Sequence, residues 1–289
     1  MSFNAFWYLG LTALSLALLT FMFYKKRNNR TLIQFLVVIE IAYLIEAVIY
    51  VFLGSYTYHP KLIKHNAYYD SHMGALASNL ITIPVLATFI SVFQLGWGWI
   101  ISCIGFLAAI EWLFVKLQIY TLHWWRIEYT ALGLLIYFPL TKMLYRRVLH
   151  PFHGILHSVF LFLCIAPISG TLQFLPFMFF SNREYIPGWY KDLYVDTSAF
   201  GDVYYVCESL FLVFMTKRKW THRWLKYAVT ALFFAAVTVI LKKVGILHSY
   251  VWWDPWVYIL YPLAILKFAE VIGERLSSSP IPPPSQKQS

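Results

Sequence analysis

The chain carries little charge and few of the residues that mark catalytic or covalent frameworks. Asp, Glu, Lys and Arg make up 12% of its 289 residues, whereas hydrophobic residues make up 60%. A soluble domain of this length needs a far more charged surface, so a water-soluble fold is excluded. The three cysteines, Cys103, Cys164 and Cys207, all lie inside apolar runs, which excludes a disulfide framework. The sequence lacks P-loop, GxSxG, HExxH and GxGxxG motifs, which lowers the expectation of an enzyme without excluding one.

Long apolar runs are what the sequence has instead, and several reach the ~20 residues required to cross a bilayer core. They lie at about 5–24, 31–53, 74–95, 99–120, 128–145, 154–180, 201–216, 226–247 and 256–271. They predict an all-α polytopic membrane protein with nine transmembrane helices. No basic residue precedes the first run, and Lys25, Lys26, Arg27 and Arg30 follow it, the reverse of a secretory signal. We therefore expect an uncleaved first helix with its N-terminus outside.

The basic residues divide unequally between the two sides of such a membrane protein. With the N-terminus outside, the inner side receives 15 of the 23 Lys and Arg residues and the outer side receives 8. This bias is the one that the positive-inside rule predicts, and it places the C-terminus in the cytoplasm. The inner loop 217–226 mixes Lys and Arg with Trp, but it joins two spans. We therefore expect it to contact anionic lipid rather than nucleic acid. Protein partners are not indicated by the sequence.

One stretch of the chain occurs twice. Residues 116–140 and 243–263 each run from one apolar helix through a His, a Trp-Trp pair and an acidic residue into a second apolar helix. Further matches at offsets of 126 to 128 residues are Pro60 and Pro187, Lys64 and Lys191, Asp70 and Asp196, Ser71 and Ser198, Gly74 and Gly201, Lys116 and Lys243, and Trp124-Trp125 and Trp252-Trp253. Each copy holds four spans, an even number, so both copies should cross the membrane in the same sense.

The predicted organisation follows from this repetition. Residues 1–30 form an N-terminal helix and a basic loop, 31–150 and 151–272 form two parallel four-helix repeats, and 273–289 form a disordered, Pro- and Ser-rich cytoplasmic tail. The outer loops that end near Ser-His or Thr-Ser, and the Lys-led segments that lead to Trp-Trp and a Pro-containing helix, resemble a family of small uncharacterised membrane proteins. That family has four or five helices and is common in Bacillus-type and Clostridium-type bacteria.

The chain looks like a tandem version of that family over about residues 31–271. The resemblance implies a bacterial plasma membrane and the helix count, and it implies no activity. We expect no cofactor.

Polar and aromatic residues gather in the loops that should lie outside, at 54–73 and 181–200 and around the two Trp pairs. One interpretation is an outer vestibule that binds a small molecule, a lipid or an envelope partner. Its candidate residues are Asp70, His72, His123, Trp124, Trp125, Glu128, His248, Trp252, Trp253 and Asp254. The other interpretation is an aromatic belt at the level of the lipid headgroups.

Four polar residues, Glu46, Asn79, Glu111 and Glu208, fall within the predicted spans. An ionisable group in hydrocarbon costs about 2.5–3.5 kcal/mol or more, so each carboxyl needs a partner, a proton or a water-filled cavity. These residues either form a ligand or ion path between the repeats, or hydrogen-bond neighbouring helices together.

Three functional interpretations therefore stay open. The leading one is a non-enzymatic binding protein that works from its outer face. The first alternative is a secondary transporter or channel that uses the intramembrane carboxylates. The second is a membrane enzyme acting on a lipid or envelope precursor, for which Asp70, His72, His123 and Glu128 would have to converge.

A weak metal candidate lies on the inner side of the predicted membrane protein. His153 and His157 are four residues apart, which places them on one helix face at a spacing that suits a transition metal. The second copy offers no equivalent pair, and interfacial histidines near anionic headgroups explain the same pattern. No firm metal site is predicted.

Overall fold

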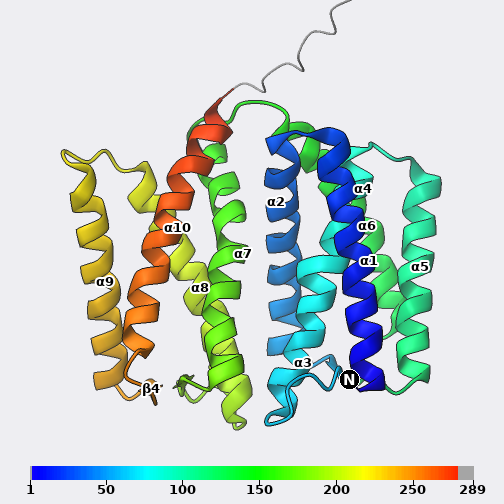
Figure 1. Cartoon of the computed structure of the whole chain (residues 1–289), viewed down its shortest axis with the longest axis horizontal. Coiled ribbons are helices and arrows are strands. Elements are labelled where there is room, and N and C mark those ends of the chain that lie inside the picture. Colours follow the sequence, from blue (N-terminus) through cyan, green and yellow to red (C-terminus); the bar gives the residue numbers. More distant parts are fainter. Residues whose placement is uncertain (1, 279–289) are drawn as a thin grey trace, which may run out of the picture.

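The apolar runs form nine long helices in the computed structural model, which describes residues 2–278 (Figure 1). Two of the nine contain a π-helical segment (η). The helices are α1 Phe3–Lys26; α2 Asn29–Glu46 with η1 Ala47–Phe52; α3 Ala67–Ala75 with η2 Leu76–Thr82 and α4 Ile83–Val92; α5 Trp97–Lys116; α6 Ile127–Val148; α7 Gly154–Phe180; α8 Leu193–Lys217; α9 Arg223–Lys243; and α10 Asp254–Ser277.

All of these helices except α6 are long and apolar enough to cross a bilayer, so the chain is an integral membrane protein. Its surface carries large apolar side chains, among them Leu14, Ile155 and Leu232, each at least 70% exposed. Such a surface suits lipid rather than water. The predicted disordered tail is wrong for its first residues, because α10 continues to Ser277. Residues 279–289 lie outside the described part of the chain.

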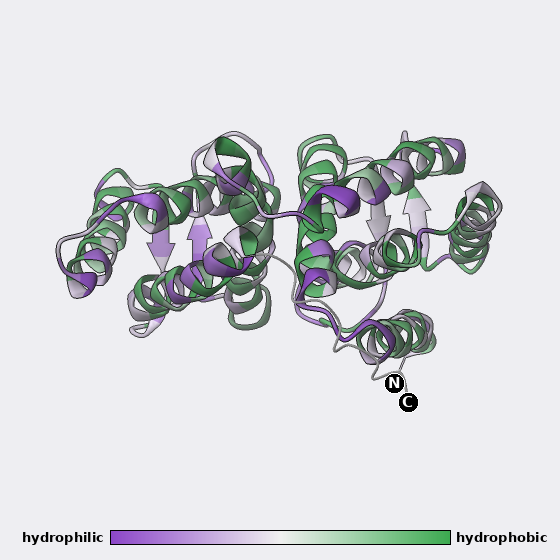
Figure 2. Cartoon of the chain, turned by 90° about the horizontal axis from the view of Figure 1, so that it is seen from above, coloured by the Kyte–Doolittle hydropathy of each residue, from purple (hydrophilic) through white to green (hydrophobic). Residues whose placement is uncertain are grey.

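The helices form two groups that lie side by side (Figures 1 and 2). The first group consists of α1 to α6, and the second consists of α7 to α10. In the first group α2 packs against α4 and α6, and α5 packs against α6; in the second, α7 packs against α8 and α10, and α9 packs against α10. The two groups meet where α2 packs against α7 and η1 packs against α8.

Two short antiparallel strand pairs lie at the end of the molecule where α1 begins, opposite the end where α10 finishes (Figure 1). The first pair is β1 Tyr56–Tyr58 with β2 Tyr120–Leu122, and the second is β3 Arg183–Tyr185 with β4 Leu247–Ser249. Tyr56 pairs with Leu122, and Arg183 pairs with Ser249. Both members of the second pairing follow those of the first by 127 positions, so the two ladders have the same register. These strands were not expected from the sequence.

Buried carboxylates fix the loops between each first strand and the next helix. Asp70 accepts hydrogen bonds from the backbone N–H groups of residues 61, 62 and 63 at 2.6–2.8 Å. Asp196 accepts from residues 188, 189 and 190 at 2.8–2.9 Å. Lys61 and Gly188 occupy the left-handed region, with φ of 56° and 80°, as the tight turn around each carboxylate requires. Hydrogen bonds to an ionised acceptor are about twice as strong as neutral ones, so these carboxylates hold the loops firmly.

Helices α3 and α8 begin earlier than the sequence predicted. Residues 54–73 and 181–200 were expected to be loops, but α3 starts at Ala67 and α8 at Leu193. The side chains of Asn66 and Asp192 cap them by accepting hydrogen bonds from the N–H groups two and three residues later. The sequence analysis missed these first helical turns because their residues are polar and rich in Tyr, as loops often are.

The expected match between Ser71 and Ser198 is displaced by one residue in the structure. Ser71 Oγ accepts a hydrogen bond from the backbone N–H of Tyr58 at 2.9 Å. In the second group the corresponding bond runs from the N–H of Tyr185 to Thr197 Oγ1 at 3.1 Å. The strands are therefore related by 127 positions and these helix starts by 126.

Gly74 gives a test of this packing between strand and helix. A Cβ atom at Gly74 would lie 2.3 Å from Tyr58 Cβ, whereas a Cβ at Gly105 would meet nothing within 4 Å. Gly74→Ala should lower the unfolding free energy by about 1–3 kcal/mol through overpacking. Gly105→Ala should leave it unchanged or raise it by up to ~1 kcal/mol. Thermal midpoints of the two purified variants in detergent check this, and equal midpoints would contradict the packing.

Candidate functional site

A cavity of about 190 Å³ lies inside the first group, between α1, α2, η2, α5 and α6 and beneath β1 and β2. We call it the first-group cavity. Its aromatic wall consists of Tyr8, Tyr56, Tyr58, Phe114, Tyr120, Trp125, Tyr129 and Tyr137. Glu46, Asn79 and Glu111 also line it, and among the described residues no Lys, Arg or His belongs to the lining. The structure thus brings three of the four intramembrane candidates into one place.

These three polar side chains have unused hydrogen-bonding capacity. Glu46 is 9% exposed; its Oε2 accepts a hydrogen bond from the Tyr56 hydroxyl at 2.5 Å, but its Oε1 has no partner within the described residues. Asn79 Nδ2 and Glu111 Oε1 are likewise buried without a partner in residues 2–278. Buried polar atoms without partners are rare in native proteins and cost about 1–3 kcal/mol each. Their convergence on one cavity makes it the candidate functional site.

The local backbone explains how these residues reach the cavity. Glu46 immediately precedes η1, and Asn79 lies within η2. A π-helical turn inserts a residue into an α-helix and re-aims its neighbours, and such turns are frequent at functional sites. The ladder then closes the cavity, because alternation along β1 turns both Tyr56 and Tyr58 inward. Burial raises the pKa values of Tyr56, Tyr58 and Tyr120 well above their ordinary value, so these phenols stay protonated.

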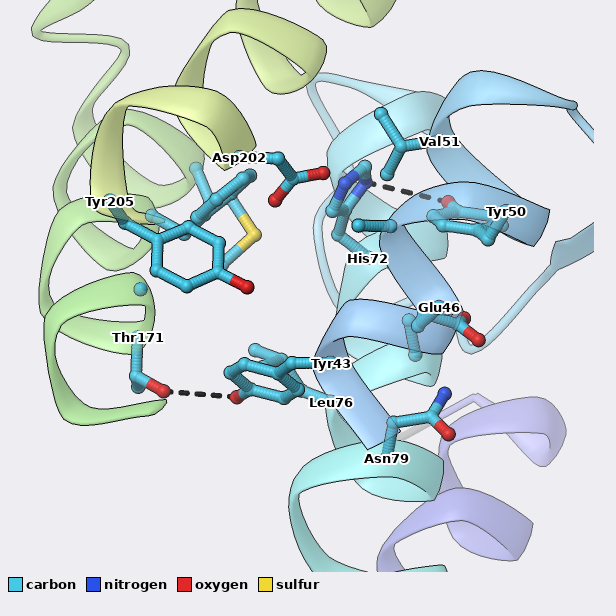
Figure 3. A pocket seen from close by; sticks show the side chains of 15 residues that line it. Tyr43, Glu46, Tyr50, Val51, His72, Leu76, Asn79, Thr171, Asp202 and Tyr205 are labelled. Carbon is cyan, nitrogen blue, oxygen red and sulfur yellow. Dashed lines mark hydrogen bonds between the residues drawn. The ribbon is translucent and has the colours of Figure 1, made fainter. Parts of the chain in front are cut away.

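A second, smaller cavity of about 70 Å³ lies where the two groups meet, and we call it the intergroup cavity (Figure 3). Glu46 and Asn79 line both cavities. Figure 3 shows the Asn79 amide turned toward the Glu46 carboxylate. It also shows Asp202 pointing from α8 toward His72. His72 Nε2 and Asp202 Oδ2 are buried and have no partner among the described side chains.

In the second group, the ladder position that corresponds to Tyr56 is occupied by Arg183, 127 residues later in the chain. Arg183 is 1% exposed, and its Nε and Nη2 donate to the two carboxylate oxygens of Asp254 at 2.8 Å each. Its Nη1 donates to the Tyr185 hydroxyl at 2.7 Å, and its guanidinium lies 3.1 Å from the ring centroid of Tyr258. An acidic and aromatic cage thus encloses a cation that belongs to the chain.

Glu208, the fourth intramembrane candidate, lies in the second group and lines neither cavity. The hydroxyl of Ser169 donates to its Oε1 and the hydroxyl of Tyr261 donates to its Oε2, both at 2.6 Å. Both oxygens are therefore used, as expected of a carboxyl that joins helices.

The ten residues proposed for an outer vestibule occupy several different environments. Trp125 lines the first-group cavity and His72 lines the intergroup cavity. Asp70 holds the loop before α3, and Asp254 pairs with Arg183. The remaining six, His123, Trp124, Glu128, His248, Trp252 and Trp253, line neither cavity.

These six lie near the strand pairs. His123 hydrogen-bonds Thr57 at 2.8 Å, and Trp124 Nε1 donates to the Leu53 carbonyl at 2.8 Å. Trp252 is 83% exposed, as a headgroup-level belt residue would be. Within the described residues no hydrogen bond joins any two of Asp70, His72, His123 and Glu128, which an acid–base site among them would require.

The weak metal candidates, His153 and His157, lie at the start of α7, at the end of the molecule away from the strand pairs (Figure 1). His153 is an exposed residue that precedes α7, whereas His157 is buried. His157 Nε2 bonds the Gly273 carbonyl at 2.9 Å, and its Nδ1 lies 3.2 Å from Lys217 Nζ. Among residues 2–278 no group of three His, Cys, Asp or Glu side chains is placed to hold a metal ion.

Sequence reasoning missed most of the cavity wall, including Tyr8, Tyr58 and Tyr120. The alternation Tyr56-Thr57-Tyr58 is a strand signal that could have placed two rings on one face. No family model matches the chain, and no curated protein or solved structure matches it either. Functional inference therefore starts from the two cavities and their residues.

Proposed function

We propose that this chain is a multi-pass protein of a bacterial plasma membrane that binds a small molecule in the first-group cavity. The observation that carries the proposal is the convergence of Glu46, Asn79 and Glu111, each with an unpaired buried atom, on one aromatic-lined space. Ligand sites in proteins are concave, largely apolar, and equipped with a few convergent polar groups.

A purely structural role explains Glu208 better than it explains Glu46 or Glu111. Both oxygens of Glu208 accept hydrogen bonds from neighbouring helices. Glu46 and Glu111 each leave one oxygen without a partner in the described chain. Glu40 Oε2 also has no partner in the described chain and lines neither cavity, so the convergence of Glu46 and Glu111 on one cavity, and not an unpaired oxygen alone, supports binding.

The proposal includes an architecture of one N-terminal span followed by two parallel four-span repeats, with α6 as the ninth span. The common register of the two ladders supports it. Left-handed residues also recur 127 positions apart: Gly54 and Ser181, Lys61 and Gly188, and Gln118 and Gly245. This agreement in backbone conformation favours a tandem member of the four- to five-helix family that the sequence resembles.

The proposed orientation places the strand pairs outside and the C-terminus in the cytoplasm. The positive residues at the far ends of the helices support it, because Lys25 and Lys26 end α1, Arg146 and Arg147 lie in the last turn of α6, and Lys217 ends α8. The same residues would contact anionic lipid at the inner leaflet.

Cysteine labelling tests both the repeat and the orientation. In a variant without the three native cysteines, Trp124→Cys and Trp252→Cys should each react with a membrane-impermeant thiol reagent added to intact cells. Lys219→Cys should react only after permeabilisation, because its loop lies at the other end of the helices. Labelling of positions 124 and 252 from opposite sides would rule out parallel repeats.

A thermal-shift screen tests the binding function. Small cationic, neutral and anionic compounds are added to the purified chain in nanodiscs; a ligand present at 100 times its Kd adds about 2.7 kcal/mol to the folding free energy. Gly133 lines the cavity at an exposed position with open space around its Cβ position, so Gly133→Phe should obstruct the opening of the cavity and abolish stabilisation.

The matched control for this screen is Gly105→Phe, at a lipid-exposed position of α5 that also has open space, and it should keep the response. A screen in which no compound stabilises the unaltered chain, or in which Gly133→Phe responds like the unaltered chain, would refute binding in this cavity.

A secondary transporter is the second candidate, because Glu46 and Asn79 connect the first-group cavity to the intergroup cavity. In proteoliposomes, transport should appear as cation or proton flux above that of empty liposomes. Glu111→Gln and Asp202→Asn should reduce the flux about tenfold or more, because each removes a carboxylate from the route. Glu208→Gln should retain it. If no flux is detected, or if Glu111→Gln leaves the flux unchanged, the transporter hypothesis is wrong and only the binding hypothesis remains.

A further inference from the structure

We infer that the ligand of the first-group cavity is a small organic cation, held with its charged nitrogen between Glu46 and Glu111 and its apolar body against the aromatic wall. This inference rests on the proposed binding function and adds the chemical class of the ligand.

The charges of the cavity favour a cation. Two carboxyl groups line it, and no basic side chain among the described residues does. An anion would meet acceptors of its own sign, and a neutral apolar molecule would leave the two buried carboxyls without a compensating charge. A cationic nitrogen between the carboxyls supplies that charge to both of them, with or without N–H groups, and burial would otherwise penalise their ionised form.

The aromatic wall favours an organic cation over a metal ion. The faces of Tyr and Trp rings attract cations within about 6 Å of the ring centroid, and several such rings together form a cage for ammonium groups. Hard metal ions instead take about six or more oxygen ligands. Here two carboxyls, one amide and three hydroxyl side chains (Ser78, Thr82 and Thr130) accompany eight aromatic side chains, which suits a ligand with one charged group and a substantial apolar body.

The second group supplies an internal example of the same chemistry. Arg183 holds its guanidinium against Asp254 and over the ring of Tyr258, in a cage of one carboxylate and two tyrosines. At the corresponding ladder position the first group has Tyr56, which carries no charge. The first-group cavity has carboxyl and aromatic groups of its own in Glu46, Glu111 and the tyrosines around them, but no basic side chain of the described residues lines it, so its cation would come from outside the chain.

The cavity also has an opening through which such a ligand can pass. Tyr129 and Gly133, on the wall formed by α6, are exposed, and Tyr129 is 42% exposed. Both residues lie in the first two turns of α6, near the strand pairs. Ile45, which also lines the cavity, is 47% exposed on α2, so the exposed lining residues lie in the half of the helices nearer the strand pairs, the half that is proposed to face outward.

Three probes of nearly equal shape test the charge class with the full chain in nanodiscs. Benzyltrimethylammonium is the cation, neopentylbenzene is its neutral isostere, and phenylmethanesulfonate is an anion with the same benzyl group. Binding that Gly133→Phe abolishes counts as binding in the cavity. We expect the cation to bind at least about thirtyfold more tightly than either of the other probes.

Charge-removing variants identify the carboxyls. Glu46→Gln and Glu111→Gln should each weaken binding of benzyltrimethylammonium about tenfold or more, whereas Glu208→Gln should not change it. Glu111→Gln decides the matter if Glu46→Gln fails to fold, because no hydrogen bond of Glu111 Oε1 is lost in the described chain.

The outcomes separate the ligand class from the binding function. Tighter or equal binding of the neutral or anionic probe overturns the cation inference and leaves binding in the cavity intact. The same conclusion follows if benzyltrimethylammonium does not bind but neutral or anionic compounds of the screen bind in a way that Gly133→Phe abolishes. Failure of every compound in the screen refutes the binding function and the cation inference together.

Discussion

The need to pair every polar group away from water governs this structure. Helices satisfy most backbone groups, and in the loops the two ladders and the carboxylates of Asp70 and Asp196, each of which accepts three backbone hydrogen bonds, satisfy many of the others. In the second group Arg183 and Asp254 satisfy each other. The unpaired atoms of Glu46, Asn79 and Glu111 are among sixteen such buried atoms in the described chain, and they differ from most of the others in that they line one cavity. Because all three side chains line one cavity, a ligand bound there is the simplest hydrogen-bonding partner for them.

Two groups with one ladder geometry differ in what fills their interior. Arg183 in the second group brings a buried charge, a bidentate ion pair and a stacked ring, which together occupy the space beneath β3 and β4. Tyr56 in the first group reaches Glu46 instead and leaves a cavity of about 190 Å³. A buried ion pair adds little stability over well-packed apolar residues. The ion pair in the second group and the cavity in the first are the main difference between the two groups at the ladder.

Sequence reasoning succeeded where a pattern is local and failed where it depends on packing. The run 154–180 coincides with α7 (Gly154–Phe180), and 99–120 lies close to α5 (Trp97–Lys116), because bilayer thickness dictates the length of an apolar helix. The first turns of α3 and α8 were missed because their Tyr and Asp residues are typical of loops. The meeting of Glu46, Asn79 and Glu111 could not be predicted, since it depends on how three helices rotate about their axes. Nor could the sequence show that Glu208 is fully hydrogen-bonded.

The π-helical turns connect the repetition to the site. Among the described residues both turns lie in the first group, one directly after Glu46 and the other containing Asn79, whereas α7 and α8 continue without them. Each turn adds a residue to its helix and redirects the side chains around it. Two such insertions, on neighbouring helices and beside the polar residues that face both cavities, alter the first group where its interior differs from that of the second. The helix winding and the ladder residue, Tyr56 in the first group and Arg183 in the second, thus differ between the groups at the place where the first-group cavity lies.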